Sequence, residues 1–123
     1  MDSALKLYKR FIDDLAEVQQ RGDVAAGRVK EKHLWPTSAT NDLVRQNKII
    51  KSLSDEDREI VSEMLQGARN GGIFDVLVYL QEEMDLNDLR ITIDGIELPI
   101  GPFWDLFHDW QYRCSGKNWP DEK

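Results

Sequence analysis

The sequence of 123 residues has one cysteine, four prolines and no long apolar run. A single cysteine, Cys114, excludes a disulfide within the chain, so nothing in the sequence requires an oxidising compartment. The longest apolar stretch, residues 76–80, is far too short to span a bilayer, and the charged start of the chain does not resemble a signal peptide. We therefore expect a cytoplasmic protein that does not enter a membrane.

The well-marked signatures of enzymes and metal proteins are also missing. There is no Gly-x-Ser-x-Gly elbow, no His-Glu-x-x-His pair and no Cys-x-x-Cys motif. A calcium loop starting at Asp85 would need glycine at its sixth position and glutamate at its twelfth, where Arg90 and Ile96 stand. We expect no cofactor, and the pattern favours a protein without catalytic activity.

Positive charge is scarce in the second half of the chain. The net charge of −7 lies entirely after residue 60, because acidic and basic residues balance before it. Between Asp75 and Asp109 the carboxylates greatly outnumber the single basic residue, Arg90. Such a stretch repels nucleic-acid phosphates and anionic lipids, so we expect no nucleic acid partner. A cationic protein surface or a metal ion is the better electrostatic match.

Helical periodicity is the main pattern that the sequence does show. Apolar residues recur at helical spacing in several segments, and Ser54 followed by Asp57 resembles a capping box. Asn70-Gly71-Gly72 is typical of the left-handed turn that ends a helix. The apolar arc of the segment after it is so wide that we expect a central, buried helix. The expected helices are 3–18, 41–53, 54–70, 73–84 and 103–114, and residues 22–34 are ambiguous.

The hydrophobic period changes to two around an Asp94-Gly95 pair, which is a strong hairpin signal. A two-residue turn there pairs Ile93 with Ile96, and Thr92 with Glu97. The fold class we expect is mainly α (α+β): a compact bundle of about four to five helices with one β-hairpin near residues 89–98, in a single domain. Because a lone hairpin is marginal in water, it must pack on a helix or pair with the edge of another chain, so a homodimer stays an open alternative.

The last expected helix carries the candidate catalytic residues. One face forms a core stripe, and the opposite face carries Asp105, His108 and Asp109. Either carboxylate could orient His108 as a general base, or the three could hold a divalent metal. The alternative, which we favour, is a solvated helix face, because catalytic sets usually draw on several elements around a cleft.

A set of acidic residues and one aromatic residue form the candidate binding site. The acidic run at the end of the central helix is either a solvated turn, which we favour, or an interaction patch, for which the uneven charge argues. Trp104 lies off the core stripe, so we expect an exposed aromatic anchor there. The candidate binding residues are Glu82, Glu83, Asp85, Asp88 and Trp104.

Short motifs of the second half resemble a group of small bacterial proteins classed as a domain of unknown function. They are Gly71-Gly72-Ile73, the run Asp94 to Pro99, His108-Asp109-Trp110, Gly116 and Trp119-Pro120. The resemblance implies a bacterial origin but no activity. From the residues we predict a non-enzymatic acidic interaction module, inhibitory or immunity-like, that binds a basic protein partner; the alternative is a small metal-assisted or acid/base hydrolase that uses His108, Asp105 and Asp109.

Overall fold

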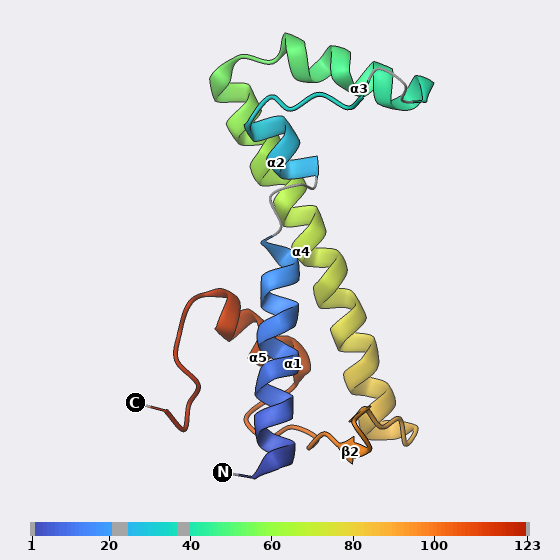
Figure 1. Cartoon of the computed structure of the whole chain (residues 1–123), viewed down its shortest axis with the longest axis vertical. Helices are drawn as coiled ribbons and strands as arrows, with labels where there is room; N and C mark the ends of the chain where they lie inside the picture. Colours follow the sequence, from blue (N-terminus) through green and yellow to red (C-terminus); the bar gives the residue numbers. More distant parts are fainter. Residues whose placement is uncertain (1, 21–24, 37–39, 123) are drawn as a thin grey trace. The chain divides into compact units, whose positions relative to one another are not determined.

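The fold was analysed in a computed structural model, which describes residues 2–20, 25–36 and 40–122. These residues form five α-helices and one two-stranded antiparallel hairpin, which confirms the mainly helical α+β class (Figure 1). The elements are α1 Ser3–Gln19, α2 Ala25–Lys30, α3 Asn41–Ser52, α4 Asp55–Leu86, β1 Thr92–Ile93, β2 Ile96–Glu97 and α5 Leu106–Cys114.

The chain divides into two compact units. Unit 1 comprises Met1–Gln20 and Gly71–Lys123, and unit 2 comprises Arg21–Asn70. The expectation of a single domain over residues 1–123 stays a prediction.

The structure corrects the expected break at Asn70-Gly71-Gly72, because α4 continues through it as one helix. Neither Gly71 nor Gly72 takes a positive φ. Glycine permits a left-handed turn without requiring one, and each glycine inside a helix costs only about 1 kcal/mol relative to alanine. The helix can tolerate this cost because tertiary packing supplies most of the stability of helices in proteins. The glycine pair instead coincides with the boundary between the two units.

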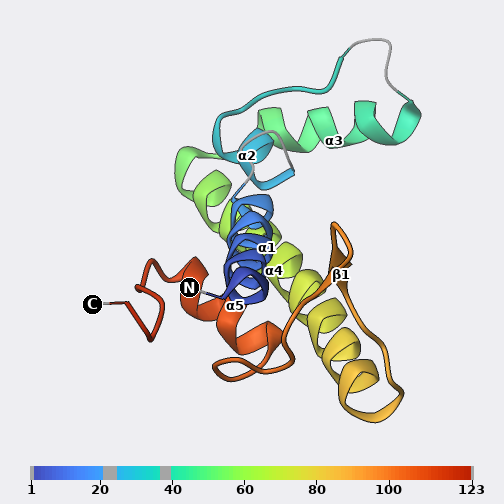
Figure 2. The same cartoon turned by 60° about the horizontal axis from the view of Figure 1, so that its bottom comes forward.

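Unit 1 holds the main hydrophobic core, built from α1, the second half of α4, the hairpin and α5. Helix α1 buries the apolar face that the sequence predicted, and α5 packs against α1. Figure 2 shows the hairpin beside α4. The buried core residues are Tyr8, Ile12, Ala16, Leu77, Met84, Leu98, Leu106, Trp110 and Trp119.

The hairpin has the predicted register, with Ile93 opposite Ile96 and Thr92 opposite Glu97. Asp94 and Gly95 both have positive φ, at 52° and 77°, which is the backbone of the turn that an Asp-Gly pair favours. The Leu98 N–H donates to the Ile91 carbonyl at 2.8 Å, so pairing extends one step beyond the strands. The hairpin packs its apolar face on the core of unit 1, as a short isolated hairpin must.

The last helix begins three residues later than predicted, at Leu106 rather than Phe103. Asp105 is its N-cap: the backbone there is extended, and the side chain accepts a hydrogen bond from the His108 N–H. Gly116 follows the helix with φ 78°, as its position after the helix end predicted.

The polar side of α1 is not wholly solvated, because Lys9 is buried. Its ammonium lies 2.8 Å from Asp121 and 2.9 Å from Glu122, both near the end of the chain. These contacts hold the last residues against α1, and a periodicity argument confined to one helix could not find them.

Unit 2 holds α2, α3 and the first half of α4. Asn47 of α3 clamps Trp35 through both backbone groups: the Trp35 N–H donates to Oδ1 at 2.7 Å, and Nδ2 donates to the Trp35 carbonyl at 3.0 Å. The Ser62 hydroxyl of α4 donates to the Ala26 carbonyl of α2 at 2.7 Å. At the start of α4 the Ser54 hydroxyl accepts from the Asp57 N–H, which confirms the cap predicted from the sequence.

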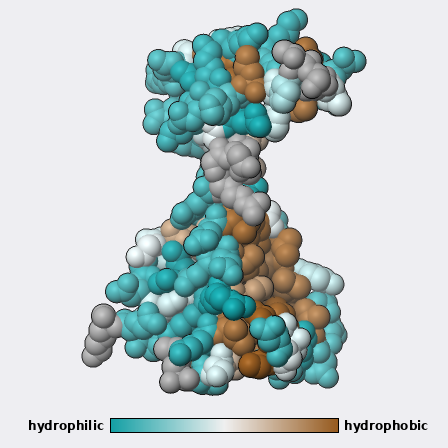
Figure 3. Space-filling view, viewed as in Figure 1, coloured by the Kyte–Doolittle hydropathy of each residue, from teal (hydrophilic) through white to brown (hydrophobic). Residues whose placement is uncertain are grey.

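Helix α4 is less buried in unit 1 than its wide apolar arc suggested. Leu77 is buried, but Val76 and Tyr79 are 57% and 59% exposed. Figure 3 shows apolar side chains reaching the surface of unit 1 beside α1. The core of unit 1 takes up only one side of α4, so the expectation of a fully central helix was wrong. Across the described segments, no helix is both long and apolar enough to cross a membrane.

Candidate binding site

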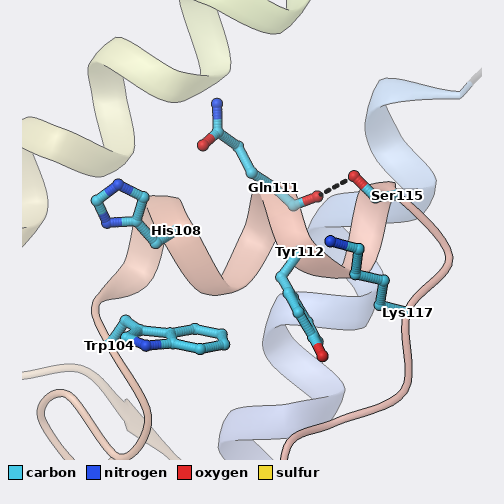
Figure 4. A pocket seen from close by; sticks show the side chains of 6 residues that line it. All are labelled: Trp104, His108, Gln111, Tyr112, Ser115 and Lys117. Atoms are coloured by element: carbon cyan, nitrogen blue, oxygen red, sulfur yellow. Dashed lines mark hydrogen bonds between the residues drawn. The ribbon is translucent and has the colours of Figure 1, made fainter.

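Two hollows in unit 1 share the side chain of Trp104. The first, called the acidic hollow, has a volume of about 460 Å³ and lies between α4 and the start of α5. It is lined by Val78, Gln81, Glu82, Asp85, Ile100, Gly101, Trp104, Asp105 and Phe107. The second, called the donor hollow, has a volume of about 410 Å³ and follows α5 to its end. It is lined by Trp104, His108, Gln111, Tyr112, Ser115 and Lys117 (Figure 4).

The acidic hollow combines three carboxylates with an apolar lining. Glu82 and Asp85 come from α4, and Asp105 comes from the residue that caps α5. Val78, Ile100, Phe107 and Trp104 supply its apolar and aromatic surface. This arrangement suits a group that has a positive end and a hydrocarbon stem.

A buried glutamine joins the two helices that form the acidic hollow. Gln81 of α4 accepts a hydrogen bond from the Leu106 N–H at 2.9 Å, which satisfies one of the free N–H groups at the start of α5. Its Nε2 donates to Asp85 Oδ1 at 3.0 Å. Gln81 thus fixes the start of α5 against α4 and restrains one carboxylate of the hollow. The sequence analysis missed it, although an amide inside a strongly apolar helix was a signal that a partner was needed.

The exposed Trp104 side chain is 53% accessible, as the sequence predicted. Its ring lies 5.1 Å from that of Tyr112 at 58°, and the backbone N–H of Trp104 donates to Asp109 Oδ1 at 3.3 Å. The loop before it requires Gly101, whose φ is 59° and where a Cβ would lie 3.2 Å from the Trp104 carbonyl oxygen. Trp104 is therefore exposed but anchored through its backbone.

Asp109 was expected on the solvated face with His108, and that expectation was wrong. The residue is completely buried, and its Oδ2 accepts a hydrogen bond of 2.5 Å from the Tyr8 hydroxyl. Burial raises the pKa of Asp109, and it outweighs the hydrogen bonds from Tyr8 and the Trp104 N–H, which lower it. Asp109 thus ties α5 and Trp104 to α1 and has no access to a substrate.

His108 and Asp105 do form a pair at the junction of the two hollows. His108 Nδ1 lies 2.7 Å from Asp105 Oδ2, while Asp105 Oδ1 accepts from the His108 N–H at 2.7 Å. The same carboxylate therefore caps the helix and orients the imidazole. Within residues 2–20, 25–36 and 40–122, no group of three or more His, Cys, Asp or Glu side chains is placed to hold a metal ion.

The four predicted binding carboxylates of the acidic run do not all line one hollow. Glu82 and Asp85 line the acidic hollow, whereas Glu83 and Asp88 do not. Glu83 accepts from Asn87 Nδ2 at 3.2 Å, and Asp88 lies 2.9 Å from Arg90 in an ion pair. Asp88 also has φ 65° in the turn after α4. Glu82 and Asp85 therefore line the hollow, whereas Glu83 and Asp88 have local partners outside it.

The donor hollow contains residues that the sequence analysis did not select. Ser115 and Lys117 lie beyond α5, where a wheel of that helix carries little information, and Gln111 lies within it. The signal that could have found them is the lysine directly after Gly116, because it is a cation in a strongly acidic half.

Sequence comparison supplies the family. The chain matches the model of the family of unknown function DUF6547 over residues 1–121. The chain belongs to this family. The match corrects the resemblance drawn from motifs of the second half, because the DUF6547 model covers essentially the whole chain. Comparison with curated proteins and with solved structures gives no match.

Proposed function

We propose that this DUF6547 protein is a non-enzymatic interaction module whose acidic hollow binds a lysine or arginine side chain of a basic protein partner. The observation that carries the proposal is the composition of the hollow: Glu82, Asp85 and Asp105 beside the exposed ring of Trp104. A bacterial, cytoplasmic and inhibitory or immunity-like role belongs to the same proposal.

Each part of the acidic hollow has a use in holding such a side chain. An ammonium or guanidinium group gains about 0.5–1 kcal/mol on an exposed tryptophan face, and more when water is excluded. The carboxylates attract the same charge, and the apolar lining contacts the methylene groups of its stem. The negative charge of the surrounding half steers basic partners toward the hollow and disfavours acidic ones.

The test is a double charge reversal, Glu82→Lys with Asp85→Lys. We expect the affinity for the capped peptide acetyl-Gly-Arg-Gly-amide to fall about tenfold or more, since two attractions become repulsions. Heteronuclear NMR titration measures weak binding and locates it through the Trp104 indole N–H. Lysine suits the C-terminal end of a helix, so circular dichroism should show an unchanged helix content.

The matched control is Glu59→Lys with Glu63→Lys, which changes the net charge equally at two exposed positions of α4 in unit 2. The control should retain binding, and added salt should weaken binding to the wild type. Equal losses in both variants would mean that only the overall charge matters, and shifts scattered away from Trp104 would refute the site.

A second candidate function is acid/base hydrolysis by His108, with Asp105 orienting its ring through the 2.7 Å contact. It predicts that His108→Ala abolishes turnover of a panel of chromogenic esters and phosphoesters. Asp105→Asn keeps an N-cap residue and should lower turnover without unfolding α5. A purified wild-type protein that turns over none of these substrates, or a His108→Ala variant as active as wild type, would refute it.

A further inference from the structure

The donor hollow provides the chemistry that the acidic hollow lacks. The Lys117 ammonium lies 5.2 Å from the centre of the Tyr112 ring, and no ion pair recorded for the described residues involves it. Gln111 adds an amide donor at the surface. Figure 4 shows the Trp104 and Tyr112 rings on the same side of α5, with the Lys117 amine near Tyr112. A positive group beside an aromatic ring suits an anion.

The opposite character of the two hollows points to one extended ligand. Both are lined by Trp104, so a segment lying across that ring would reach carboxylates on one side and Lys117 on the other. A basic residue and an acidic residue in the segment would then each meet a group of opposite charge. A carboxylate fits better than a phosphate, because a dianion would be repelled more strongly by the neighbouring Glu82, Asp85 and Asp105.

We infer that the partner segment recognised at Trp104 carries an acidic residue close to its basic residue, and that Lys117 in the donor hollow binds this carboxylate. The inference rests on the proposed function, since the basic residue occupies the acidic hollow. It adds a requirement for the partner: a short, exposed peptide segment with one basic and one acidic residue, rather than a uniformly basic surface.

The experiment compares capped peptides that contain one arginine and one glutamate, separated by a varied number of glycines, with the same peptides in which glutamine replaces the glutamate. At the best spacing, glutamate should tighten binding to the full chain about two- to fivefold, which is the range for one exposed ion pair. NMR should show added shifts at the Gln111 side-chain amide and at the backbone of residues 115–117.

Lys117→Met is the test variant, because it keeps a long apolar stem and removes only the charge. It should remove the advantage of glutamate while leaving the arginine and glutamine peptide bound as before. Lys6→Met, at an exposed position of α1, is the matched control and should retain the advantage.

Failure of this inference is distinguishable from failure of the proposed function. If glutamate gives no advantage at any spacing while the arginine and glutamine peptide binds, the inference is refuted and the acidic hollow stands. If the glutamine peptide does not bind at all, the proposed function and the inference resting on it both fail. A phosphoserine peptide that binds more tightly than the glutamate peptide would overturn the assignment of a carboxylate.

Discussion

Replacing Trp119 with alanine is expected to lower the free energy of unfolding by about 3–5 kcal/mol, the range for removing a buried tryptophan. The side chain is 3% exposed and packs against Phe103 at 5.3 Å and Tyr8 at 6.3 Å between ring centres. The Arg113 guanidinium lies 5.0 Å from its ring. Trp119 thus fastens the end of the chain to the core, and its loss would leave a cavity beside α1.

Urea unfolding followed by circular dichroism measures this effect. Trp104→Ala is the matched control, because the same substitution at a side chain that is 53% exposed should cost much less. A Trp119→Ala variant as stable as Trp104→Ala would show that the last residues do not belong to the core in solution.

Replacing Asp109 with alanine should cost about 2–4 kcal/mol, because it leaves the buried Tyr8 hydroxyl and the partly buried Trp104 backbone N–H without an acceptor. Asp109→Asn keeps an oxygen acceptor and should cost less. Thermal and urea unfolding give both values. Should the alanine variant prove no less stable than the asparagine variant, the buried contact would not contribute as described.

The difference in stability between the wild type and Asp109→Asn should depend on pH. Because burial raises the pKa of Asp109, the folded chain holds a proton that the unfolded chain releases near pH ~4. The stability that this group contributes is complete below that pH and is lost as pH rises through the raised pKa. Asp109→Asn cannot titrate, so its stability relative to wild type should improve as pH rises from about 4. A difference that stays constant with pH would contradict the assignment.

Several structural elements of this protein could be predicted from the sequence, because they depend on local chemistry. The hairpin register follows from Asp94-Gly95 and the period-two pattern, since few other residues accept the positive φ of that turn. The apolar face of α1 and the Ser54 cap also lie where residue spacing placed them. Trp104 is exposed as predicted, although it lies in the loop before α5 and not on the helix itself. The turn, the cap and the helix face depend on residues close in the chain.

The tertiary structure alone decided which polar groups are buried and which carboxylates share a hollow. Asp109 lies on a helix face that spacing marked as solvated, and Lys9 lies on the polar side of α1, but Tyr8 covers one and Asp121 pairs with the other. Asp85 joins Asp105 at one hollow because Gln81 holds the start of α5 against α4. Partners about a hundred residues apart leave no periodic trace in the sequence. The sequence therefore determined the hairpin, most of the helical segments and the charge, and only the packing of distant segments brought the residues of the candidate site together.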